Sequence, residues 1–164
     1  MSATDRVRVT TVVAVEPAEA FELFTADVDL WWRRGPRWRA DGRRPSTLRF
    51  EPGRGGRLVE IYDESRGDVF EFGRVLDWEP PARLRFEFQG TNFARGEVTV
   101  VEVRLEPDAD GTRVTLEQSG FDALRPDHPV RHGEPPAKFV ASMGAWWGDL
   151  LGALRATSRA RPPR

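Results

Sequence analysis

Two histidines late in the chain, His128 and His132, are the first candidates for chemistry, because two imidazoles with nearby carboxylates can ligate zinc. Pro129 and Gly133 argue against a helix across them, so the four-residue spacing does not place both rings on one face. The chain has 2 histidines in all and no cysteine. We therefore expect a solvated lid loop rather than a metal site, and we expect no cofactor.

A second candidate pair is Glu60 and Tyr62, which lie on the same face of a predicted strand as Leu58. An inward carboxylate beside aromatic rings would have a raised pKa and could act as a general acid or base. An exposed strand glutamate is the favoured alternative, because glutamate is seldom buried without a partner. Tyr62 suits a polar contact inside an apolar pocket, and ordinary core packing stays open for it.

Three tryptophans flank or lie in a loop between Arg33 and Pro45 that is rich in Arg, Gly and Pro. Core packing is the favoured use for Trp31 and Trp32. Ligand binding and packing are equally compatible with Trp38, which stands alone among arginines.

The same loop holds the one basic cluster of the chain. It could attract an anionic ligand or a protein partner, although a run of charges is usually a solvated loop. No nucleic-acid recognition motif accompanies it, so nucleic acid is not an expected partner. The cluster consists of Arg33, Arg34, Arg37, Arg39, Arg43 and Arg44.

Composition narrows the classes of function. The 164 residues carry 25 basic and 26 acidic side chains, so no bulk field favours nucleic acid or an acidic membrane surface. The lack of cysteine excludes disulfides and thiolate chemistry. No run of about 18 apolar residues is present, and the N-terminus has no apolar segment after its charges. We expect a cytoplasmic protein with neither a membrane span nor a signal peptide.

The candidate groups need a scaffold, and its clearest element is a helix predicted from about Pro136 to Ser158. Pro135 and Pro136 suit its first turn. Roughly 22 residues at 1.5 Å rise make a rod of about 33 Å, whose broad apolar stripe needs a wide surface to lie on. The stripe consists of Phe139, Met143, Trp147, Leu150 and Leu154, widened by Val140, Trp146 and Leu151.

The middle of the chain provides that surface as a sheet. A first strand at Val7–Val15 precedes two short helical segments, at Glu16–Phe24 and Val28–Trp32. After them, short strands alternate with turn residues, which favours one antiparallel sheet. The further predicted strands are Thr47–Glu51, Arg57–Tyr62, Val69–Trp78, Arg83–Gln89, Glu97–Glu106 and Thr112–Ser119.

Alternation within the strands indicates one covered and one solvated face. Leu84, Phe86 and Phe88 share a face, and charged residues between them take the other. We therefore predict an α+β fold: a curved antiparallel sheet of six to seven strands wrapped around a long C-terminal helix, with two short helices after the first strand. We expect a single domain over residues 1–164, with a core at about 7–156 and flexible ends at 1–6 and 159–164.

Several short motifs occur along this order of elements, from about residue 7 to 156. They are Val15–Phe21, Phe24–Thr25, Trp31–Trp32, Gly55–Arg57, Gly73–Val75, Pro80–Leu84, Gly111–Leu116, Gly120–Phe121, and Trp147 with Leu150, Leu151 and Leu154. In this order they resemble the SRPBCC (START-like) superfamily, whose arrangement is the helix-grip fold. Within it, the chain is similar to bacterial proteins related to the C-terminal domain of the activator of Hsp90 ATPase.

The resemblance implies a cavity between sheet and helix that in relatives receives small apolar or amphipathic molecules. It implies no reaction, because the family has no shared catalytic motif. Relatives often carry a histidine where this chain has Gln118, and an amide there can still hydrogen-bond a ligand. We expect no catalytic residue and a ligand site built from Trp38, Phe50, Tyr62, Phe86, Phe88, Gln118, Phe139, Met143 and Trp147.

Two other functions stay open. An interaction module acting on a chaperone or another protein would show an exposed charged or apolar patch around Arg33–Arg44 and a filled interior. A cyclase or hydrolase would draw on Glu60, Tyr62, Gln118 and the histidines, among which no pair has a recognisable nucleophile–base spacing. A small hydrophobic or amphipathic ligand is the leading expectation, ahead of a protein partner and of an enzymatic reaction.

Overall fold

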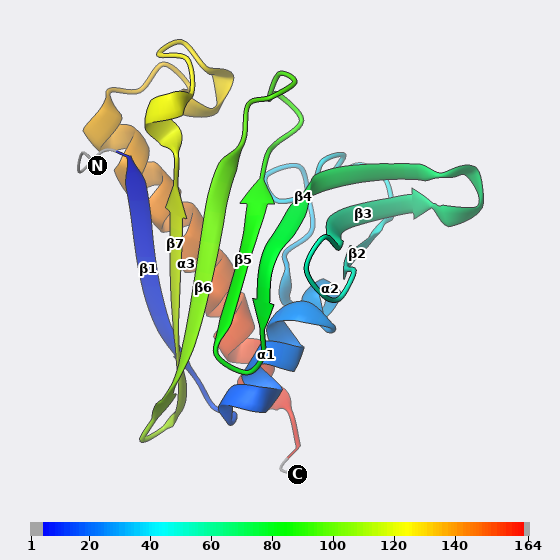
Figure 1. The fold of residues 1–164 in the computed structure, drawn as a ribbon, viewed down its shortest axis with the longest axis vertical. Helices are drawn as coiled ribbons and strands as arrows, with labels where there is room; N and C mark the ends of the chain where they lie inside the picture. Colours follow the sequence, from blue (N-terminus) through cyan, green and yellow to red (C-terminus); the bar gives the residue numbers. More distant parts are fainter. Residues whose placement is uncertain (1–4, 163–164) are drawn as a thin grey trace.

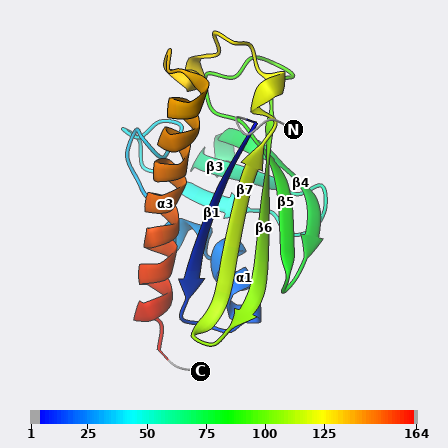
Figure 2. The same cartoon turned by 90° about the vertical axis from the view of Figure 1, so that its left-hand side faces the viewer.

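The computed structural model describes residues 5–162, in which seven strands form one sheet in the order β1-β7-β6-β5-β4-β3-β2. Every neighbouring pair is antiparallel. The sheet curls around one long helix (Figures 1 and 2). The strands are β1 (Arg6–Val13), β2 (Thr47–Phe50), β3 (Arg57–Asp63), β4 (Asp68–Glu79), β5 (Arg83–Phe88), β6 (Thr99–Asp108) and β7 (Gly111–Ser119).

Three α-helices complete the fold. The long one, α3, runs alongside β1 and across the concave side of the sheet (Figure 2). This arrangement confirms the predicted α+β helix-grip fold. Within the described residues, no helix has the length and apolar character needed to cross a membrane. The helices are α1 (Pro17–Thr25), α2 (Val28–Trp31) and α3 (Pro136–Ala160), with 3₁₀ turns at Glu64–Arg66, Phe121–Ala123 and Pro129–Arg131.

Two boundaries differ from the prediction. The first strand ends at Val13 rather than Val15, and α3 continues to Ala160 rather than ending at Ser158. The Ala14 N–H donates to Ser158 Oγ at 3.1 Å, so the end of β1 is tied to the last turn of the helix. Of the ends expected to be flexible, residues 1–4 and 163–164 lie outside the described residues.

The apolar stripe of α3 packs into the sheet. Trp147 is fully buried, and Met143 is half-buried near the start of the helix. Asp149 and Arg155, on the opposite side, are exposed. The buried apolar residues of α3 are Phe139, Trp147, Leu150, Leu151 and Leu154.

Aromatic rings meet where α2, the sheet and α3 converge. The ring centroid of Trp32 lies 5.8 Å from that of Trp147 and 6.1 Å from those of Phe88 and Trp146. Both Trp31 and Trp32 are only 2% exposed. Their favoured interpretation as core residues agrees with these contacts, and the cluster joins α2 to α3 across the concave face.

We expect Trp147→Ala to lower the free energy of unfolding by about 3–5 kcal/mol, because it removes a fully buried indole and leaves a cavity. Asp149→Ala is the matched control on the same helix. It should cost well under about 1 kcal/mol, since the carboxylate is exposed. Urea unfolding of both variants measures the difference. Equal and small losses would mean that α3 does not rest on the sheet through Trp147.

Candidate functional site

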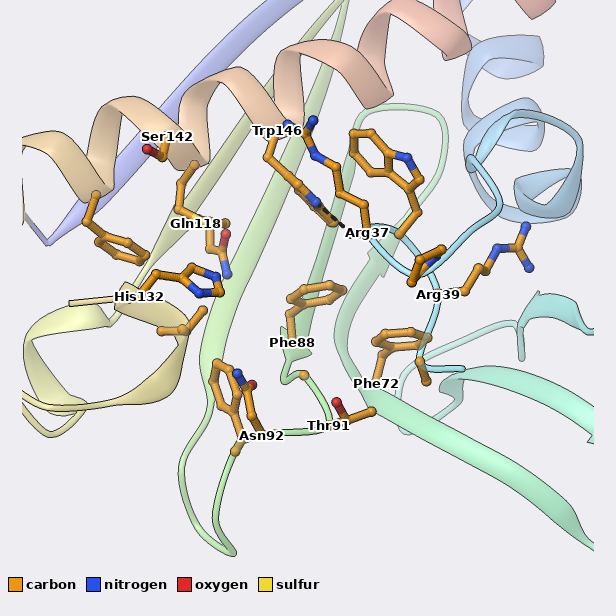
Figure 3. Close-up of a pocket in the computed structure, with 18 of the residues that line it drawn as sticks. Arg37, Arg39, Phe72, Phe88, Thr91, Asn92, Gln118, His132, Ser142 and Trp146 are labelled. Atoms are coloured by element: carbon orange, nitrogen blue, oxygen red, sulfur yellow. Dashed lines mark hydrogen bonds between the residues drawn. The ribbon is translucent and has the colours of Figure 1, made fainter. Parts of the chain in front are cut away.

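A pocket of about 480 Å³ opens where three loops approach the N-terminal half of α3. The loops are the α2–β2 loop (residues 36–40), the β5–β6 loop (90–93) and the β7–α3 loop (130–134), and residues of β4, β5 and β7 form the remaining wall. Figure 3 shows side chains from all of these segments turned toward a common space. The pocket therefore lies at one end of the sheet, beside the first turns of the helix.

Aromatic side chains make most of the apolar wall. Trp38 and Trp146 pack with ring centroids 5.2 Å apart, and the guanidinium of Arg37 lies 4.9 Å from the Trp38 ring. Across the pocket, Phe72 and Phe88 are stacked at 5.6 Å with an interplanar angle of 9°. Such surfaces suit flat or aliphatic apolar groups. Phe93, Val130, Phe139 and Met143 extend the wall.

Two polar side chains on facing loops have free hydrogen-bonding capacity. Asn92 belongs to the β5–β6 loop and His132 to the β7–α3 loop, and both line the pocket (Figure 3). Within residues 5–162, neither side chain forms a hydrogen bond with another protein group. A ligand with one polar end could therefore be bound without displacing an existing contact.

Gln118 lines the same pocket, and both ends of its amide are hydrogen-bonded within the protein. Its carbonyl oxygen accepts from Trp147 Nε1 at 2.8 Å, and its amide nitrogen donates to Thr99 Oγ1 at 2.9 Å. Thr99 in turn donates to the carbonyl oxygen of Phe88 at 2.7 Å. All of these side chains are at least nine-tenths buried, so this chain of bonds fixes the position of the pocket wall.

The α2–β2 loop is held by side chains that bind its backbone. The indole nitrogens of Trp32 and Trp146 donate to the carbonyl oxygens of Trp38 and Arg37, each at 3.0 Å. The bond from Trp146 is dashed in Figure 3. These contacts give a loop without regular structure a defined path, so that Trp38 reaches the pocket.

Glu60 and Tyr62 bind the same loop from β3. Glu60 is fully buried; it accepts from the Ala40 N–H at 2.9 Å and from the Tyr62 hydroxyl. The favoured interpretation of Glu60 as an exposed strand residue is therefore wrong. The Tyr62 oxygen accepts from the Asp41 N–H at 2.7 Å. Burial and the hydrogen bond to Glu60 raise the pKa of Tyr62 well above its usual value, so its hydroxyl stays protonated.

The arginines of this loop are mostly occupied within the protein. Arg39 has a side chain only 2% exposed; it pairs with Asp29 at 3.0 Å and donates to the carbonyl oxygens of Trp32 and Arg33. Burial would raise the pKa of Asp29, but hydrogen bonds from the Leu48 N–H and Arg39 outweigh it and lower the pKa. Further ion pairs are Arg34–Asp29, Arg37–Asp149 and Arg44–Asp68. A free basic patch, as an interaction module would need here, is not formed by these four residues.

The two histidines differ in their surroundings. His128, expected in a solvated loop, is only 1% exposed; its Nδ1 accepts from the Val130 N–H at 3.1 Å, and its Nε2 lies 3.2 Å from Glu97 Oε1. Burial follows from its packing on Phe93, with ring centroids 4.5 Å apart. Arg125 also pairs with Glu97, at 2.9 Å. This cluster joins the β7–α3 loop to the segment before β6 and so holds two loops of the pocket together.

Five of the nine expected ligand residues line the pocket: Trp38, Phe88, Gln118, Phe139 and Met143. The other four lie elsewhere. Phe50, Phe86 and Trp147 are buried in the core, and Tyr62 binds the α2–β2 loop. The pocket also has lining residues that the sequence reasoning did not assign to it, among them Phe72, Asn92, Phe93, His132 and Trp146.

Comparison with known proteins identifies relatives at the level of family and fold. A family model described as "Activator of Hsp90 ATPase homolog 1-like protein" matches residues 14–156. No curated protein matches the chain. Among solved structures, the chain is similar to protein MLL2253 from Mesorhizobium loti, with 21% identity and a TM-score of 0.63 over 96% of this chain and 99% of the other.

Two further solved structures have informative descriptions. DynU16, described as a putative protein in the dynemicin biosynthetic locus, shares 25% identity with a TM-score of 0.62, over 95% of this chain and 48% of its own. The Aha1 dimer from Colwellia psychrerythraea shares 13% identity with a TM-score of 0.63, over 94% of this chain and 96% of its own. At these identities the structural likeness concerns the fold.

We expect Gln118→Leu to lower the free energy of unfolding by about 1–3 kcal/mol, because it leaves the buried Trp147 indole N–H without an acceptor, while the Thr99 hydroxyl keeps its bond to the carbonyl oxygen of Phe88. Gln89→Leu is the control, since that half-buried amide makes one long bond of 3.4 Å; its cost should stay under about 1 kcal/mol. Adding Trp147→Phe should cost less in the Gln118→Leu background than in the wild type. Additive losses would show that the two side chains do not depend on each other.

Glu97 generates a prediction about pH. The hydrogen bond from Arg125, helped by the Ala94 N–H, lowers the pKa of Glu97 from 4.5 to about 2. Because the folded value lies below the unfolded one, the ionised carboxylate stabilises the fold fully above 4.5 and loses this effect as the pH falls toward 2. The stability difference between the wild type and Glu97→Gln should therefore be large at neutral pH and shrink across that interval. Glu106→Gln, at an exposed position, should show no such change; a difference independent of pH at Glu97 would contradict the pairing.

Proposed function

We propose that this chain, which belongs to the family of Activator of Hsp90 ATPase homolog 1-like proteins, binds a small hydrophobic or amphipathic molecule in the pocket beside the N-terminal half of α3. The observation that carries the proposal is a space of about 480 Å³ with aromatic walls and two uncommitted polar side chains. Pockets of this size are typical for small-molecule ligands. Its walls come from the sheet, α3 and three loops of one chain, so we propose a single binding domain.

Direct contacts to the ligand are assigned to the expected residues that reach the pocket. Trp38, Phe88, Phe139 and Met143 would cover its apolar part. Gln118 would form part of the wall while its amide stays bonded to Trp147 and Thr99. Asn92 and His132 would bind a polar end. The similarity to DynU16, a protein of a biosynthetic locus, agrees with a small molecule as the ligand.

A binding role fits the site better than a reaction. The buried carboxylate of Glu60 is engaged by the Ala40 N–H and by Tyr62, beneath the loop rather than in the pocket. Tyr62 keeps its proton, and Gln118 is occupied at both ends. The one hydroxyl–carboxylate contact among the described lining residues is a long bond of 3.3 Å from the exposed Ser142 to Glu134, and no third described side chain orients this pair as a catalytic base would require. The residues there offer shape, apolar surface and two polar contacts.

The test uses 1-anilinonaphthalene-8-sulfonate, a fluorescent probe with aromatic rings and a polar group. Met143→Trp places an indole in the pocket and should raise the Kd of the probe by about tenfold or more. Ala145→Trp adds the same group to an exposed position of α3 and should leave the Kd unchanged. Equal affinity in both variants would place the probe outside the pocket. Native mass spectrometry of protein from its own host then identifies the natural occupant.

A further inference from the structure

The two edges of the sheet differ in how far other segments of the chain cover them. At the β2 edge, the Leu48 N–H donates to Asp29 Oδ1 at 2.8 Å, so α2 occupies the edge. At the β1 edge, the Ala14 N–H bonds to Ser158 just beyond the end of the strand. Within residues 5–162, no loop or helix end binds the backbone of Thr10 or Val12. An uncovered edge strand is a template for a further strand.

The register of β1 shows which backbone groups face outward. Val13 is opposite Thr112 of β7, and a Cβ added at Gly111 would lie 2.1 Å from the Val13 carbonyl oxygen. The backbone of Val13 therefore points toward β7. Because hydrogen-bonded and non-bonded pairs alternate along antiparallel strands, Val12 and Thr10 direct their N–H and C=O groups to the open edge. The Ala14 N–H, which reaches Ser158, has the same direction.

A groove of about 600 Å³ lies along this edge, on the side of the C-terminal half of α3. Figures 1 and 2 both show α3 following β1 toward that end of the molecule, away from the ligand pocket. Arg155 and Arg159 form the helix side of the groove and are exposed. In the part of the chain that the structure describes, neither forms an ion pair. Asp110 is the one acidic residue in the lining.

We propose that this groove binds an acidic segment of another protein in extended conformation, as an added strand next to β1. The outward groups of Thr10 and Val12 include both donors and acceptors, which a peptide backbone satisfies and a simple anion does not. Arg155 and Arg159 supply the charge that selects acidic side chains.

The spacing of the two arginines agrees with a strand. Four residues of α-helix at 1.5 Å rise separate them by about 6 Å along the helix axis. Side chains two residues apart on one face of a strand are separated by about 6.8 Å. Two acidic residues with one residue between them would therefore face Arg155 and Arg159 together. The segment recognised would have the pattern acidic–any–acidic among residues that favour strands.

A second copy of this chain fits the groove less well. Pairing of two β1 strands would bring Arg155 and Arg159 of both copies close together, and neither arginine has an ion-pair partner among the described residues. Like charges at such an interface oppose association. The complementary surface is acidic, and the arginines favour a different chain as the occupant.

The experiment uses a fluorescein-labelled peptide of sequence VTEVEVT and measures its anisotropy at low ionic strength. The Arg155→Glu/Arg159→Glu variant should raise the Kd by about tenfold or more, since two ion pairs become repulsions. The peptide VTKVKVT should bind that variant better than it binds the wild type. Arg54→Glu/Arg95→Glu, which changes the same charge at exposed positions elsewhere, should leave both affinities unaltered.

A second readout separates strand addition from charge attraction alone. Amide hydrogen exchange at Thr10 and Val12 should slow when VTEVEVT is bound, because their N–H groups gain partners. Unprotected amides, or equal binding by the charge-reversed variant, would overturn the proposal. Complete competition by inorganic phosphate would make the groove an anion site, and sedimentation showing a dimer through β1 would make it a self-association edge; either result overturns it too. Unchanged binding of the naphthalene probe confirms that each variant is folded.

Discussion

The orientation of α3 depends on one buried chain of hydrogen bonds, which runs from Trp147 through Gln118 and Thr99 to the carbonyl oxygen of Phe88. An indole only donates, so it must meet the carbonyl end of the amide, and the amide nitrogen must then meet the hydroxyl. The bonds are all satisfied only when the Gln118 amide has this orientation. A flipped amide would turn its N–H groups toward the indole N–H and leave buried groups unpaired. These bonds thereby fix the rotation of the helix about its own axis relative to β7, β6 and β5. In this orientation Phe139, Met143 and Trp146 face the pocket.

The second constraint is that tryptophans serve both as packing groups and as donors. Trp32 is buried among the rings of α3 and β5, and its indole nitrogen still reaches the carbonyl oxygen of Trp38. Trp146 does the same for Arg37 from the other side. Glu60 and Tyr62 complete the set by accepting hydrogen bonds from the backbone N–H groups of Ala40 and Asp41. The α2–β2 loop thus takes its path from the core, and the pocket wall that it carries is part of the folded structure.

The fold could be predicted from the sequence because its signals are local and periodic. The two-residue alternation of β5 and the helical stripe from Phe139 to Leu154 each report which face is buried. Parity, however, does not say how far along the sheet a residue lies. Phe86 and Phe88 share a face, yet only Phe88 lies at the pocket. The burial of Glu60 and Arg39 could not be predicted from parity for another reason. Glu60 binds the backbone of a loop and Arg39 binds Asp29, and only the tertiary fold brings these partners near.

The pocket proposed to bind a ligand and the groove beside β1 lie at opposite ends of one helix, which raises the question of whether binding at one would affect binding at the other. The 25 residues of α3 span about 37 Å, with the pocket residues in its first half and Arg155 and Arg159 in its second. Coupling requires an element with two arrangements that both sites influence. A shift or rotation of α3 would have to break the bond between Trp147 and Gln118 in the middle and the bond between Ala14 and Ser158 near the end. Breaking the bond between Trp147 and Gln118 leaves buried polar groups unpaired, so the helix has one favoured position. We therefore expect binding in the pocket to leave the affinity of the β1 groove unchanged, and the reverse.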